Sequence, residues 1–504
     1  MNFIDQFLNG STMYRVVLYS LCCTALIAFI QSALGTGTFP FSQLVLSLVI
    51  LSVSCQAINW LLGKVYRVPT NYESATITAL ILFLILAPAT NTIDAVTLVL
   101  AAVIAMASKY ILSINGRHLF NPAAIALVIL TFAGSTSAFW WVGSASLLPV
   151  VTITGLLVVR KTRREALFLA FLITTLLGIA FVASQNGGSI PEKLVESFLS
   201  WPLLFFATIM VTEPLTTPPT RSLQICYGIL VGMIFSSQIH GPYFSTTPEI
   251  SLIIGNIYSY MISNKQRLRL ALKTNKVIAQ HIHDLSFSSP QKLQFQPGQY
   301  MEWTLATHRN DTRGNRRYFT IASSPTETEV HLGIKAYPQG SGFKESLLAM
   351  KPGDIILASH IAGEFTLPQD PKQKIVMIAG GIGVTPFRSM IKYLSDTEDK
   401  RDVILIYAAN NENEFAYQEI FAEAKTKISL ETHYVVTEST NISKGWKGKV
   451  GRITTETLQE LVPDYDQRVF YISGPGGMVE AYKKMLHSLQ VPGSKIKTDF
   501  FPGF

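Results

Sequence analysis

The stretch Lys374–Leu394, KIVMIAGGIGVTPFRSMIKYL, decides the fold of the C-terminal part of the chain. A short apolar run is followed by the glycine turn Gly380–Gly383 and then by a helical pattern that starts near Pro386. A buried strand that leads through glycines into a helix is typical of parallel α/β sheets, which bind ligands at the carboxyl ends of their strands. Glycines there let a phosphate approach the backbone N–H groups. We therefore expect a phosphate-bearing ligand at residues 379–386.

The residues on both sides of this stretch predict two domains of different architecture. After Lys374, apolar runs such as DVILIYA and RVFYIS alternate with helical runs such as EIFAEA and VEAYKKML, a pattern typical of a parallel sheet covered on both faces. Between Lys276 and Leu367, short β-rich runs alternate with turns, which favours a small antiparallel barrel. We predict a β-barrel domain over residues 265–370 and an α/β parallel-sheet nucleotide-binding domain over residues 371–504.

The N-terminal half has the composition of a membrane domain. The chain has 504 residues, of which 48% are hydrophobic and 15% are charged, whereas soluble domains carry about 25% charged residues. Apolar runs dominate as far as Ser263. We therefore predict a polytopic all-α membrane domain over residues 1–264. Since a span needs about 20 residues, about ten spans are expected, at 14–33, 42–63, 74–90, 92–112, 121–135, 138–159, 165–184, 197–213, 221–237 and 249–263.

The basic residues predict an orientation for these spans. With the N-terminus in the cytoplasm, the connections that carry Lys64, Lys109, Arg160 and Arg164 lie inside, and Lys193 is the only basic residue on an outer loop. This asymmetry follows the positive-inside rule. The predicted location is the inner (cytoplasmic) membrane, multi-pass, with both termini cytoplasmic and the lipid bilayer as a partner. The net charge of +8 includes basic residues beside apolar segments, so we expect no nucleic-acid partner.

Cysteine and histidine patterns do not support metal or haem sites. Of the residues before 264, only His118 and His240 are histidines, whereas a haem clamped from both sides needs paired histidines on membrane helices. No cysteine has the spacing of a zinc or iron–sulfur site. The cysteines are Cys22, Cys23, Cys55 and Cys226. We expect no haem, iron–sulfur cluster or bound metal.

Two polar segments interrupt the apolar half, Asn115–Ala124 (NGRHLFNPAA) and Thr212–Thr220 (TEPLTTPPT). Polar backbone at a membrane boundary is tolerated where it lines a cavity, so each segment is a candidate border of a site. The simpler interpretation is a helix cap followed by a turn, because Asn121 is a good N-cap and Pro122 suits the first helical position. Composition alone favours this simpler interpretation.

The strings FNPAA, TEPLTTPPT and SATITALI (74–81) resemble the membrane subunits of the sodium-translocating NADH:quinone oxidoreductase and of the Rnf complex. The resemblance covers about residues 40–262 and implies a flavin in the membrane domain. Those subunits attach the flavin through its phosphate to a threonine of an S/T-G-A-T motif. This chain lacks the motif, so covalent FMN is not expected. A non-covalent FMN or riboflavin, a quinone, or no redox group at all remain open.

Three further motifs accompany the glycine turn. In Arg317-Tyr318-Phe319-Thr320, residues two apart share one face of a strand, so Arg317 and Phe319 lie together. Gly340-Ser341-Gly342-Phe343-Lys344 opens a predicted helix, whose first N–H groups attract phosphate. Ser473-Gly474-Pro475-Gly476-Gly477-Met478 follows another apolar strand. Alone, the first motif is also explained by a charged strand edge and the second by an N-capped helix.

Together with AGGIGVTP at 379–386, these motifs resemble the flavin and NAD(P) signatures of the ferredoxin–NADP reductase superfamily. The resemblance implies FAD as cofactor and NAD(P)H as substrate. It also implies that Arg317 pairs with the flavin pyrophosphate, that Phe319 packs on the isoalloxazine, and that Thr320 bonds near flavin N5. The implied cofactor-binding residues are Arg317, Phe319, Thr320, Gly340, Ser341, Gly342, Phe343, Gly380, Gly381, Gly383, Thr385, Pro386, Gly474, Pro475, Met478 and Phe504.

By the same resemblance, Thr320, Phe319 and Ser473 are the implied catalytic positions, next to the reacting atoms. Ser473 stands where many members of that superfamily have cysteine. The terminal residue Phe504 offers a ring that could cover the flavin until nicotinamide displaces it. An aromatic plug that closes the sheet is an equally good interpretation of this tail.

The sequence therefore predicts a membrane-bound flavoprotein oxidoreductase. It would pass a hydride from NAD(P)H to FAD on the cytoplasmic side and electrons onward to a membrane acceptor, a quinone or a second flavin. Residues 408–412 lack a cation, which slightly favours NADH, although Lys444, Lys447 and Arg452 could reach a 2′-phosphate. The alternatives are a transporter-like or anchoring membrane domain fused to a soluble-type flavin reductase, and an ion-pumping NADH dehydrogenase.

Overall fold

The chain forms two compact units, Met1–Ser263 and Asn264–Phe504. The computed structural model describes residues 7–8, 11–66, 70–114, 117–237, 246–263, 267–305, 315–337, 341–438 and 442–501.

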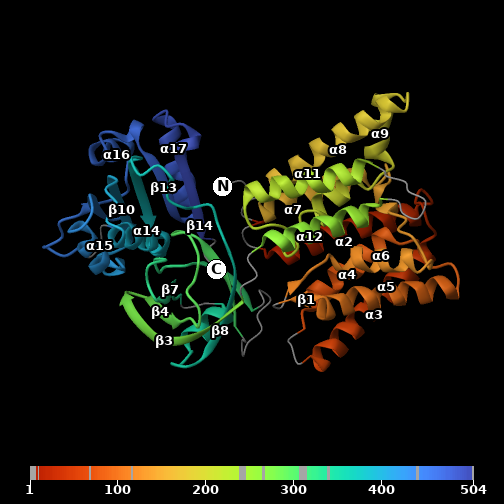
Figure 1. Ribbon diagram of the computed structural model, residues 1–504, viewed down its shortest axis with the longest axis horizontal. Coiled ribbons are helices and arrows are strands. Elements are labelled where there is room, and N and C mark those ends of the chain that lie inside the picture. Colours follow the sequence, from red (N-terminus) through yellow and green to blue (C-terminus); the bar gives the residue numbers. More distant parts are fainter. Residues whose placement is uncertain are drawn as a thin grey trace. The chain divides into compact units, whose positions relative to one another are not determined.

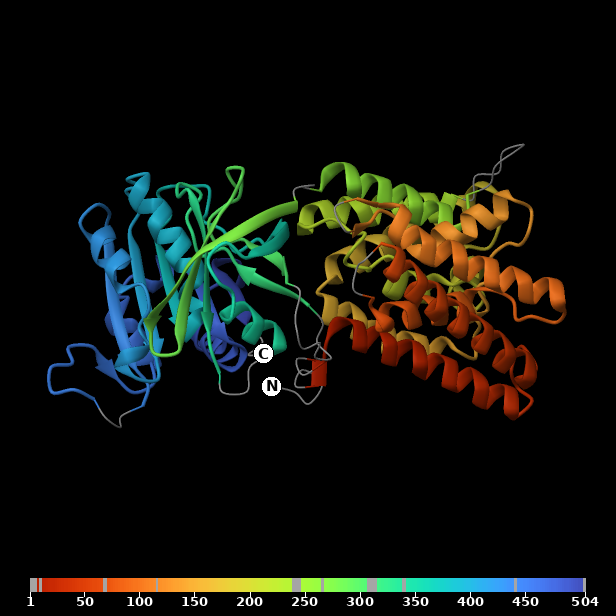
Figure 2. The same ribbon diagram turned by 90° about the horizontal axis from the view of Figure 1, so that it is seen from below.

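The first unit is a bundle of helices (Figures 1 and 2). Its α-helices are α2 (Met13–Ala33), α3 (Phe41–Val65), α4 (Tyr72–Ile85), α5 (Thr92–Ile111), α6 (Pro122–Phe132), α7 (Leu148–Thr162), α8 (Glu165–Gln185), α9 (Ile190–Leu199), α10 (Leu203–Phe205), α11 (Arg221–Ser237) and α12 (Pro248–Ile262). Its shorter elements are the hairpin β1 (Ser113–Ile114) and β2 (Arg117–His118), the 3-10 turn η1 (Trp141–Gly143) and the π-helical turn η2 (Phe206–Met210). Polar side chains begin several helices: the Asn71 oxygen accepts from the Ser74 N–H and caps α4, and Asn91 caps α5 in the same way.

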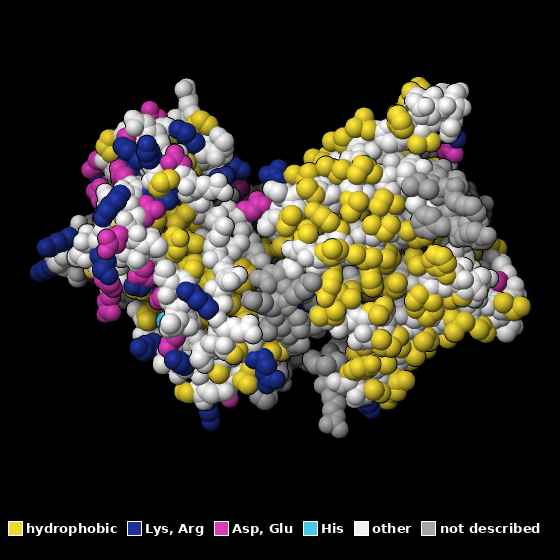
Figure 3. Space-filling view, viewed as in Figure 1, with side chains coloured by type: hydrophobic (Ala, Val, Ile, Leu, Met, Phe, Trp, Pro, Cys, Tyr) yellow, Lys and Arg dark blue, Asp and Glu magenta, His cyan; other side chains and the backbone are white. Residues whose placement is uncertain are grey.

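Four helices of this unit, α2, α3, α5 and α8, are long and apolar enough to cross a membrane. A fifth span results if α9 is combined with Leu203–Met210, but these two pieces meet at an angle of 66°. On α8, Ile173, Leu177 and Phe181 are exposed. The visible face of this unit is largely hydrophobic (Figure 3). An outward apolar face of this kind suits lipid better than water.

The expected number of about ten spans is not reached by length and composition. The apolar run expected to span 197–213 is broken before α10, where Pro202 has no N–H to continue a helix. The run at 138–159 becomes helical only from Leu148, because Trp140 has a left-handed backbone (φ 48°) and its Nε1 donates to the Glu249 carboxylate at 2.7 Å. The helices α4 and α6 are too short for a regular span. Ten spans therefore remain a prediction.

Helices α8 and α11 lie side by side (Figure 1) and pack closely through glycines. A Cβ added to Gly228 would lie 2.8 Å from the Leu167 carbonyl oxygen, and one added to Gly232 would lie 2.9 Å from that of Phe171. Both distances are below van der Waals contact. Small residues at these positions let the two backbones approach, as is common for helices that pack in membranes.

The second unit begins with a six-stranded antiparallel sheet in the order β6-β5-β8-β3-β4-β7. Its elements are β3 (Arg267–Ala279), β4 (Ile282–Ser288), β5 (Tyr300–Thr304), β6 (Arg316–Thr320), β7 (Glu329–Lys335), α13 (Gly342–Leu348) and β8 (Ile355–Ala362). Trp303, Phe287 and Phe343 are fully buried in its core. The strand pairs in the described residues form an open series from β6 to β7, so closure into a barrel remains a prediction.

The rest of the second unit is the expected parallel sheet, in the order β12-β11-β10-β9-β13-β14. Its elements are β9 (Ile375–Gly380), η3 (Gly381–Val384), α14 (Thr385–Asp396), β10 (Val403–Ala409), η4 (Glu412–Glu414), α15 (Gln418–Lys425), β11 (Leu430–Val436), β12 (Lys449–Val450), α16 (Thr455–Leu461), η5 (Tyr465–Gln467), β13 (Val469–Pro475), α17 (Gly476–Ser488), η6 (Gly493–Lys495) and β14 (Ile496–Phe501). Ile375 and Met377 pack with α14 and α15, whereas Val376 and Ile378 pack with α16 and α17. Helices therefore cover both faces.

We expect the substitution Gly232→Ala to destabilise the first unit by about 1–3 kcal/mol, the usual effect of overpacking. The added methyl group would meet the Phe171 carbonyl oxygen and push α11 away from α8. Thermal unfolding of the full chain in detergent, followed by helical circular dichroism, measures the effect. The control is Gly188→Ala, whose added Cβ would be 3.6 Å from its nearest neighbour, the Ala183 oxygen. Equal stability of the two variants would contradict the proposed close contact.

Candidate functional site

The glycine turn lies at the carboxyl end of β9, where the strand leads through η3 into α14. Gly381 has φ +53°, a left-handed backbone that glycine adopts without steric cost. Thr385 is buried, and its hydroxyl donates to the Ile382 carbonyl oxygen at 3.2 Å. Pro386 occupies the first turn of α14, where its missing N–H costs no hydrogen bond. The N–H groups of this turn are thus at the strand end where such sheets bind ligands.

The structure brings the motif Ser473–Met478 against this turn. Strand β13 pairs with β9, so that Ser473 lies opposite Ala379. A Cβ added to Gly383 would lie 2.4 Å from the Ser473 carbonyl oxygen, and one added to Gly380 would lie 2.3 Å from Met478 Sδ. Close contact with backbone therefore requires glycine at 383, whereas a side chain at 380 would have to displace that of Met478. Ser473 is fully buried, and within the described part of the chain its hydroxyl has no hydrogen-bond partner.

The two motifs of the first sheet also lie together. On β6, Arg317 and Phe319 are half-buried on one face, while Tyr318 is exposed and its hydroxyl donates to Glu302 at 2.8 Å. The ring of Phe343 in α13 lies 6.0 Å from that of Phe319. The guanidinium carbon of Arg317 lies 5.4 Å from the same Phe343 ring. Arg317 and Phe319 thus share one half-buried face of β6 and both lie against the buried Phe343 ring.

Of four further predicted site residues, two are buried at the ends of elements and two lie outside the described residues. Ser341 accepts from the Lys344 N–H at 3.3 Å and is the N-cap of α13, as the simpler interpretation expected. Thr320 is buried at the end of β6. Gly340 and Phe504 lie outside the described residues.

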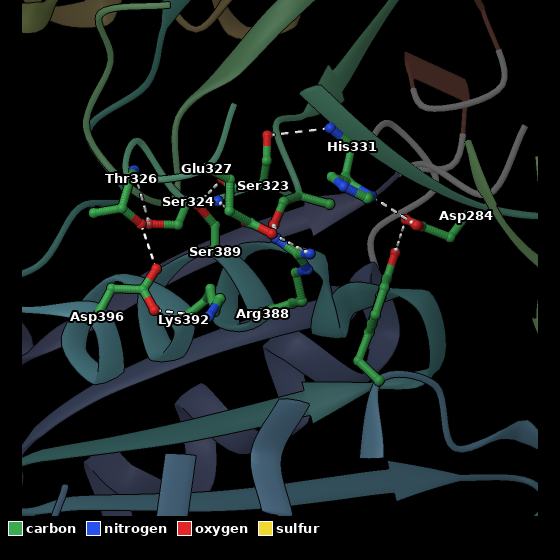
Figure 4. A network of polar contacts seen from close by, with 12 residues as sticks. Asp284, Ser323, Ser324, Thr326, Glu327, His331, Arg388, Ser389, Lys392 and Asp396 are labelled. Atoms are coloured by element: carbon green, nitrogen blue, oxygen red, sulfur yellow. Dashed lines mark hydrogen bonds and ion pairs between the residues drawn. The ribbon is translucent and has the colours of Figure 1, made fainter. Parts of the chain in front are cut away.

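A polar network joins the antiparallel sheet to the helix after the glycine turn (Figure 4). Arg388 of α14 binds both carboxylate oxygens of Glu327, with 2.8 Å between Nη2 and Oε1. Its Nη1 also donates to the Ala322 carbonyl oxygen at 3.0 Å. The neighbouring Ser389 hydroxyl donates to the Ser323 carbonyl oxygen at 2.6 Å. Burial alone would lower the pKa of Arg388, but the hydrogen bond and the charge of Glu327 raise it.

A second part of the network centres on Asp284 of β4. Its carboxylate lies 2.7 Å from His331 Nδ1 and accepts from the Tyr417 hydroxyl at 2.9 Å. Burial would raise the pKa of Asp284, but the hydrogen bond and charge of His331, and the charge of Arg388, hold it below its usual value. Burial also raises the pKa of Tyr417 well above its ordinary range.

Gly333 of β7 marks the place where the two sheets approach most closely in this network. A Cβ added to Gly333 would lie 2.5 Å from the Tyr417 hydroxyl oxygen and 2.6 Å from Thr385 Cγ2. Tyr417 itself has φ +60°, which is uncommon for a residue other than glycine. Nearby, the Lys335 ammonium and the Glu414 carboxylate form an ion pair of 2.8 Å.

Sequence reasoning missed this network. The only signal was local: Arg388 stands among the apolar residues of PFRSMI, on a helix face that faces the sheet. A charged residue in such a position is rarely buried without a partner. Its partner Glu327 is 61 residues away in the sequence, and no pattern connects the two.

In the first unit, the structure brings the two polar segments together. Glu213 accepts from the Asn121 amide at 2.9 Å and lies 3.1 Å from His118 Nε2. Asn121 also caps α6, since its oxygen accepts from the N–H groups of Ala123 and Ala124. The cap interpretation is therefore correct, and the same residue also takes part in a buried polar cluster. In that cluster, Asn256 accepts from the Asn121 N–H at 2.9 Å.

The side chains of two basic residues that were expected in cytoplasmic connections form hydrogen bonds inside the helical bundle. Lys109 lies in the last turn of α5, and its ammonium donates to the Ser74 carbonyl oxygen and the Thr78 hydroxyl, at 3.0 and 2.7 Å. Arg164 is buried and donates to the Pro218 carbonyl oxygen at 2.8 Å. Both side chains are hydrogen-bonded to other segments of the bundle, which the count of basic residues per loop does not reveal.

Comparison with known proteins identifies part of the second unit. Residues 377–484 match the sequence model of the family described as "Oxidoreductase NAD-binding domain". The chain is 27% identical over 212 residues to a flavohemoprotein of Oceanobacillus iheyensis, covering 41% of this chain and 51% of that protein. It is 26% identical over 196 residues to the glycine betaine monooxygenase reductase subunit of Chromohalobacter salexigens, covering 38% and 52%. The chain thus spans about half the length of these relatives.

Among solved structures, the chain is similar to the flavohem-like FAD/NAD-binding domain of nitric oxide dioxygenase from Vibrio cholerae. The identity is 19% and the TM-score 0.42, over 46% of this chain and 98% of that chain. On the sequence matches, the second unit contains an oxidoreductase NAD-binding domain. The resemblance of the first unit to the sodium-translocating and Rnf subunits stays a prediction.

We expect Asp284→Asn to lower the free energy of local opening at the contact between the two sheets by about 1–3 kcal/mol at pH 7. The reason is that hydrogen bonds to a charged group are lost. The folded-state pKa of Asp284 is lowered. The stability that the Asp284 carboxylate contributes is therefore complete above its pKa in the unfolded chain, about 3.9. This stability is lost as the pH falls through its lower pKa in the folded chain. The difference between parent and variant should close in acid below about pH 4.

Hydrogen exchange of peptides from α14 and α15, corrected for the intrinsic exchange rate, measures this difference in the full chain. Asp370→Asn, an exposed loop residue whose carboxylate accepts only a local N–H from Lys372 among the described hydrogen bonds, is the control. A difference that persists unchanged below that pH would contradict the assigned charge of Asp284.

Proposed function

We propose that the second unit passes a hydride from NADH to FAD, and that electrons then go to an acceptor in the membrane. The observation that carries the proposal is the contact between Gly380–Gly383 and Ser473–Met478 at the carboxyl ends of β9 and β13. A Cβ added to Gly381 would have no described neighbour within 4 Å, so the turn is open to a dinucleotide pyrophosphate at this residue. FAD supplies the chemistry of taking two electrons as a hydride and releasing them singly.

The residues of the first sheet fit the flavin half of this proposal. Arg317 can form two parallel hydrogen bonds with a pyrophosphate, because its planar fork matches the phosphate oxygens. The half-buried ring of Phe319, packed against the buried Phe343 ring, offers an apolar surface to the isoalloxazine. Thr320, at the buried end of β6, would lie nearest to flavin N5. In this arrangement Thr320, Phe319 and Ser473 are the residues next to the reacting atoms, and they act by positioning rather than by exchanging protons.

The first unit is proposed to be the acceptor side, a polytopic domain of the inner membrane with both termini in the cytoplasm. Four helices that could cross a membrane and the outward apolar face of α8 support this location. The polar cluster of Glu213, His118 and Asn121 supplies hydrogen-bonding groups inside an apolar bundle. Polar groups in that setting commonly mark a functional site. A quinone or a second, non-covalent flavin is the proposed acceptor class.

The proposal is tested by mixing the purified, flavin-loaded full chain anaerobically with NADH. We expect the flavin absorbance near 450 nm, roughly the usual flavin band, to bleach. Arg317→Gln should lower flavin occupancy by about tenfold or more, since a charge-assisted bidentate contact is removed. Arg316→Gln is the matched control, because Arg316 is exposed on the opposite face of β6 and lies near Glu302. A chain whose bound flavin is bleached by neither NADH nor NADPH would overturn the proposal.

We further expect NADH to be preferred over NADPH by about tenfold or more in kcat/KM, roughly 1.4 kcal/mol. In the segment after β10, the Glu412 carboxylate accepts from the Ser443 N–H and hydroxyl at 2.6 and 2.8 Å. An acidic residue after the second strand suits a ribose hydroxyl and repels a 2′-phosphate. Glu412→Gln should narrow the preference, whereas Glu423→Gln, an exposed residue of α15 paired with Lys427, should leave it unchanged. A parent chain that prefers NADPH would contradict this assignment.

A further inference from the structure

The polar network between the sheets joins the two halves of the proposed reaction at specific points. Ala322, whose carbonyl oxygen accepts from Arg388, lies two residues after Thr320. Arg388 lies three residues, or about one helical turn, after Thr385 at the end of the glycine turn. A short, continuous path therefore connects the end of the proposed flavin strand to the proposed nucleotide turn. Figure 4 shows Arg388 and Ser389 directed from α14 toward the segment of Ser323 and Glu327.

The contacts on this path are well suited to fix a distance. Arg388 is 3% exposed and holds Glu327 with two parallel hydrogen bonds, so neither side chain has rotational freedom. The Ser389 hydroxyl, fully buried, adds a bond of 2.6 Å to the next carbonyl group of the same segment. Two successive residues of α14 therefore donate hydrogen bonds to two successive carbonyl oxygens, those of Ala322 and Ser323.

A second contact supports Arg388 from the other side. Its guanidinium carbon lies 5.7 Å from the centre of the Tyr417 ring. The Tyr417 hydroxyl in turn donates to Asp284 on β4, which also contacts His331 on β7. The Arg388 guanidinium thus contacts the Glu327 carboxylate and the Tyr417 ring. A shift of Arg388 would break several of these contacts.

We propose that Arg388 is a positioning residue for hydride transfer: it fixes the end of β6 against the start of α14 and thereby sets the distance between flavin and nicotinamide. This inference rests on the proposed function. It assigns Arg388 no contact with either cofactor. Its predicted effect is large because a displacement of about 1 Å at a reacting centre can lower a rate by about a hundredfold.

The test uses the flavin-loaded full chain and anaerobic rapid mixing with increasing NADH, which separates the limiting rate of flavin reduction from the dissociation constant of NADH. Arg388→Lys keeps the charge but loses the planar fork. We expect its limiting rate to fall by about 10- to 100-fold, with unchanged flavin content and a dissociation constant within about twofold. With NADH deuterated at C4, the primary isotope effect should remain full, which shows that hydride transfer itself has slowed.

The matched control is Arg468→Lys. Arg468 is also buried and also holds a carboxylate with two bonds, to Asp402 at 3.0 and 2.7 Å. Its carboxylate partners in the described residues, Asp402 and Asp464, flank the parallel sheet only. This variant should keep the parent limiting rate. A slowing of equal size in both variants would mean a general loss of stability and would overturn the proposal.

Other outcomes also decide the question. An unchanged limiting rate in Arg388→Lys, a slowing that appears only as weaker NADH binding, or an isotope effect that falls to unity would each overturn the positioning role. If Arg388→Lys loses its flavin, Ser389→Ala is the decisive variant, because it removes only one neutral hydrogen bond. A severalfold lower limiting rate of flavin reduction in Ser389→Ala supports the proposal. An unchanged rate overturns it. If neither NADH nor NADPH reduces the bound flavin of the parent chain, the proposed function is overturned. The inference on Arg388 is then overturned as well.

Discussion

The second unit depends on the close approach of two backbone turns. Gly380 and Gly383 leave no room for a Cβ against Met478 and the Ser473 carbonyl group. A side chain at 383 would meet the Ser473 backbone and separate β9 from β13 at their carboxyl ends, whereas one at 380 would have to displace that of Met478. The same turn lies at the end of the sheet where parallel α/β folds bind ligands. Strand packing and the proposed nucleotide site therefore depend on the same residues.

The first unit shows the complementary solution, in which polar groups are placed inside an apolar bundle and are satisfied there. Lys109 donates to groups of α4, Arg164 donates to the carbonyl of Pro218, and Glu213 receives bonds from His118 and Asn121. Buried charges are costly unless they are paired or hydrogen-bonded. These groups therefore connect helices and turns that the chain separates by many residues.

Local patterns were predicted well from the sequence, and distant contacts were not. The strand, glycine turn and helix at 374–394 appear as expected, because each step is decided by neighbouring residues. The pairing of Arg317 and Phe319 on one face also follows from alternation along β6. The number of spans remains a prediction, because two of the expected apolar runs are interrupted, one before Pro202 and one at the left-handed Trp140. Arg388 and Asp284 were missed because their partners lie far away in the sequence. The roles of the site residues remain predictions.

Gly333 and Tyr417 have a consequence for how this unit can change over evolution. The tyrosine hydroxyl occupies the space that any side chain at 333 would need, and the tyrosine keeps its place through an unusual backbone angle. The two positions thus constrain each other across the boundary between the sheets. A nucleotide-binding half taken from a relative would fit this antiparallel sheet only if it brought a residue of matching length at position 417. The antiparallel and parallel parts of the unit can therefore pack together only if the residues at 333 and 417 match in size.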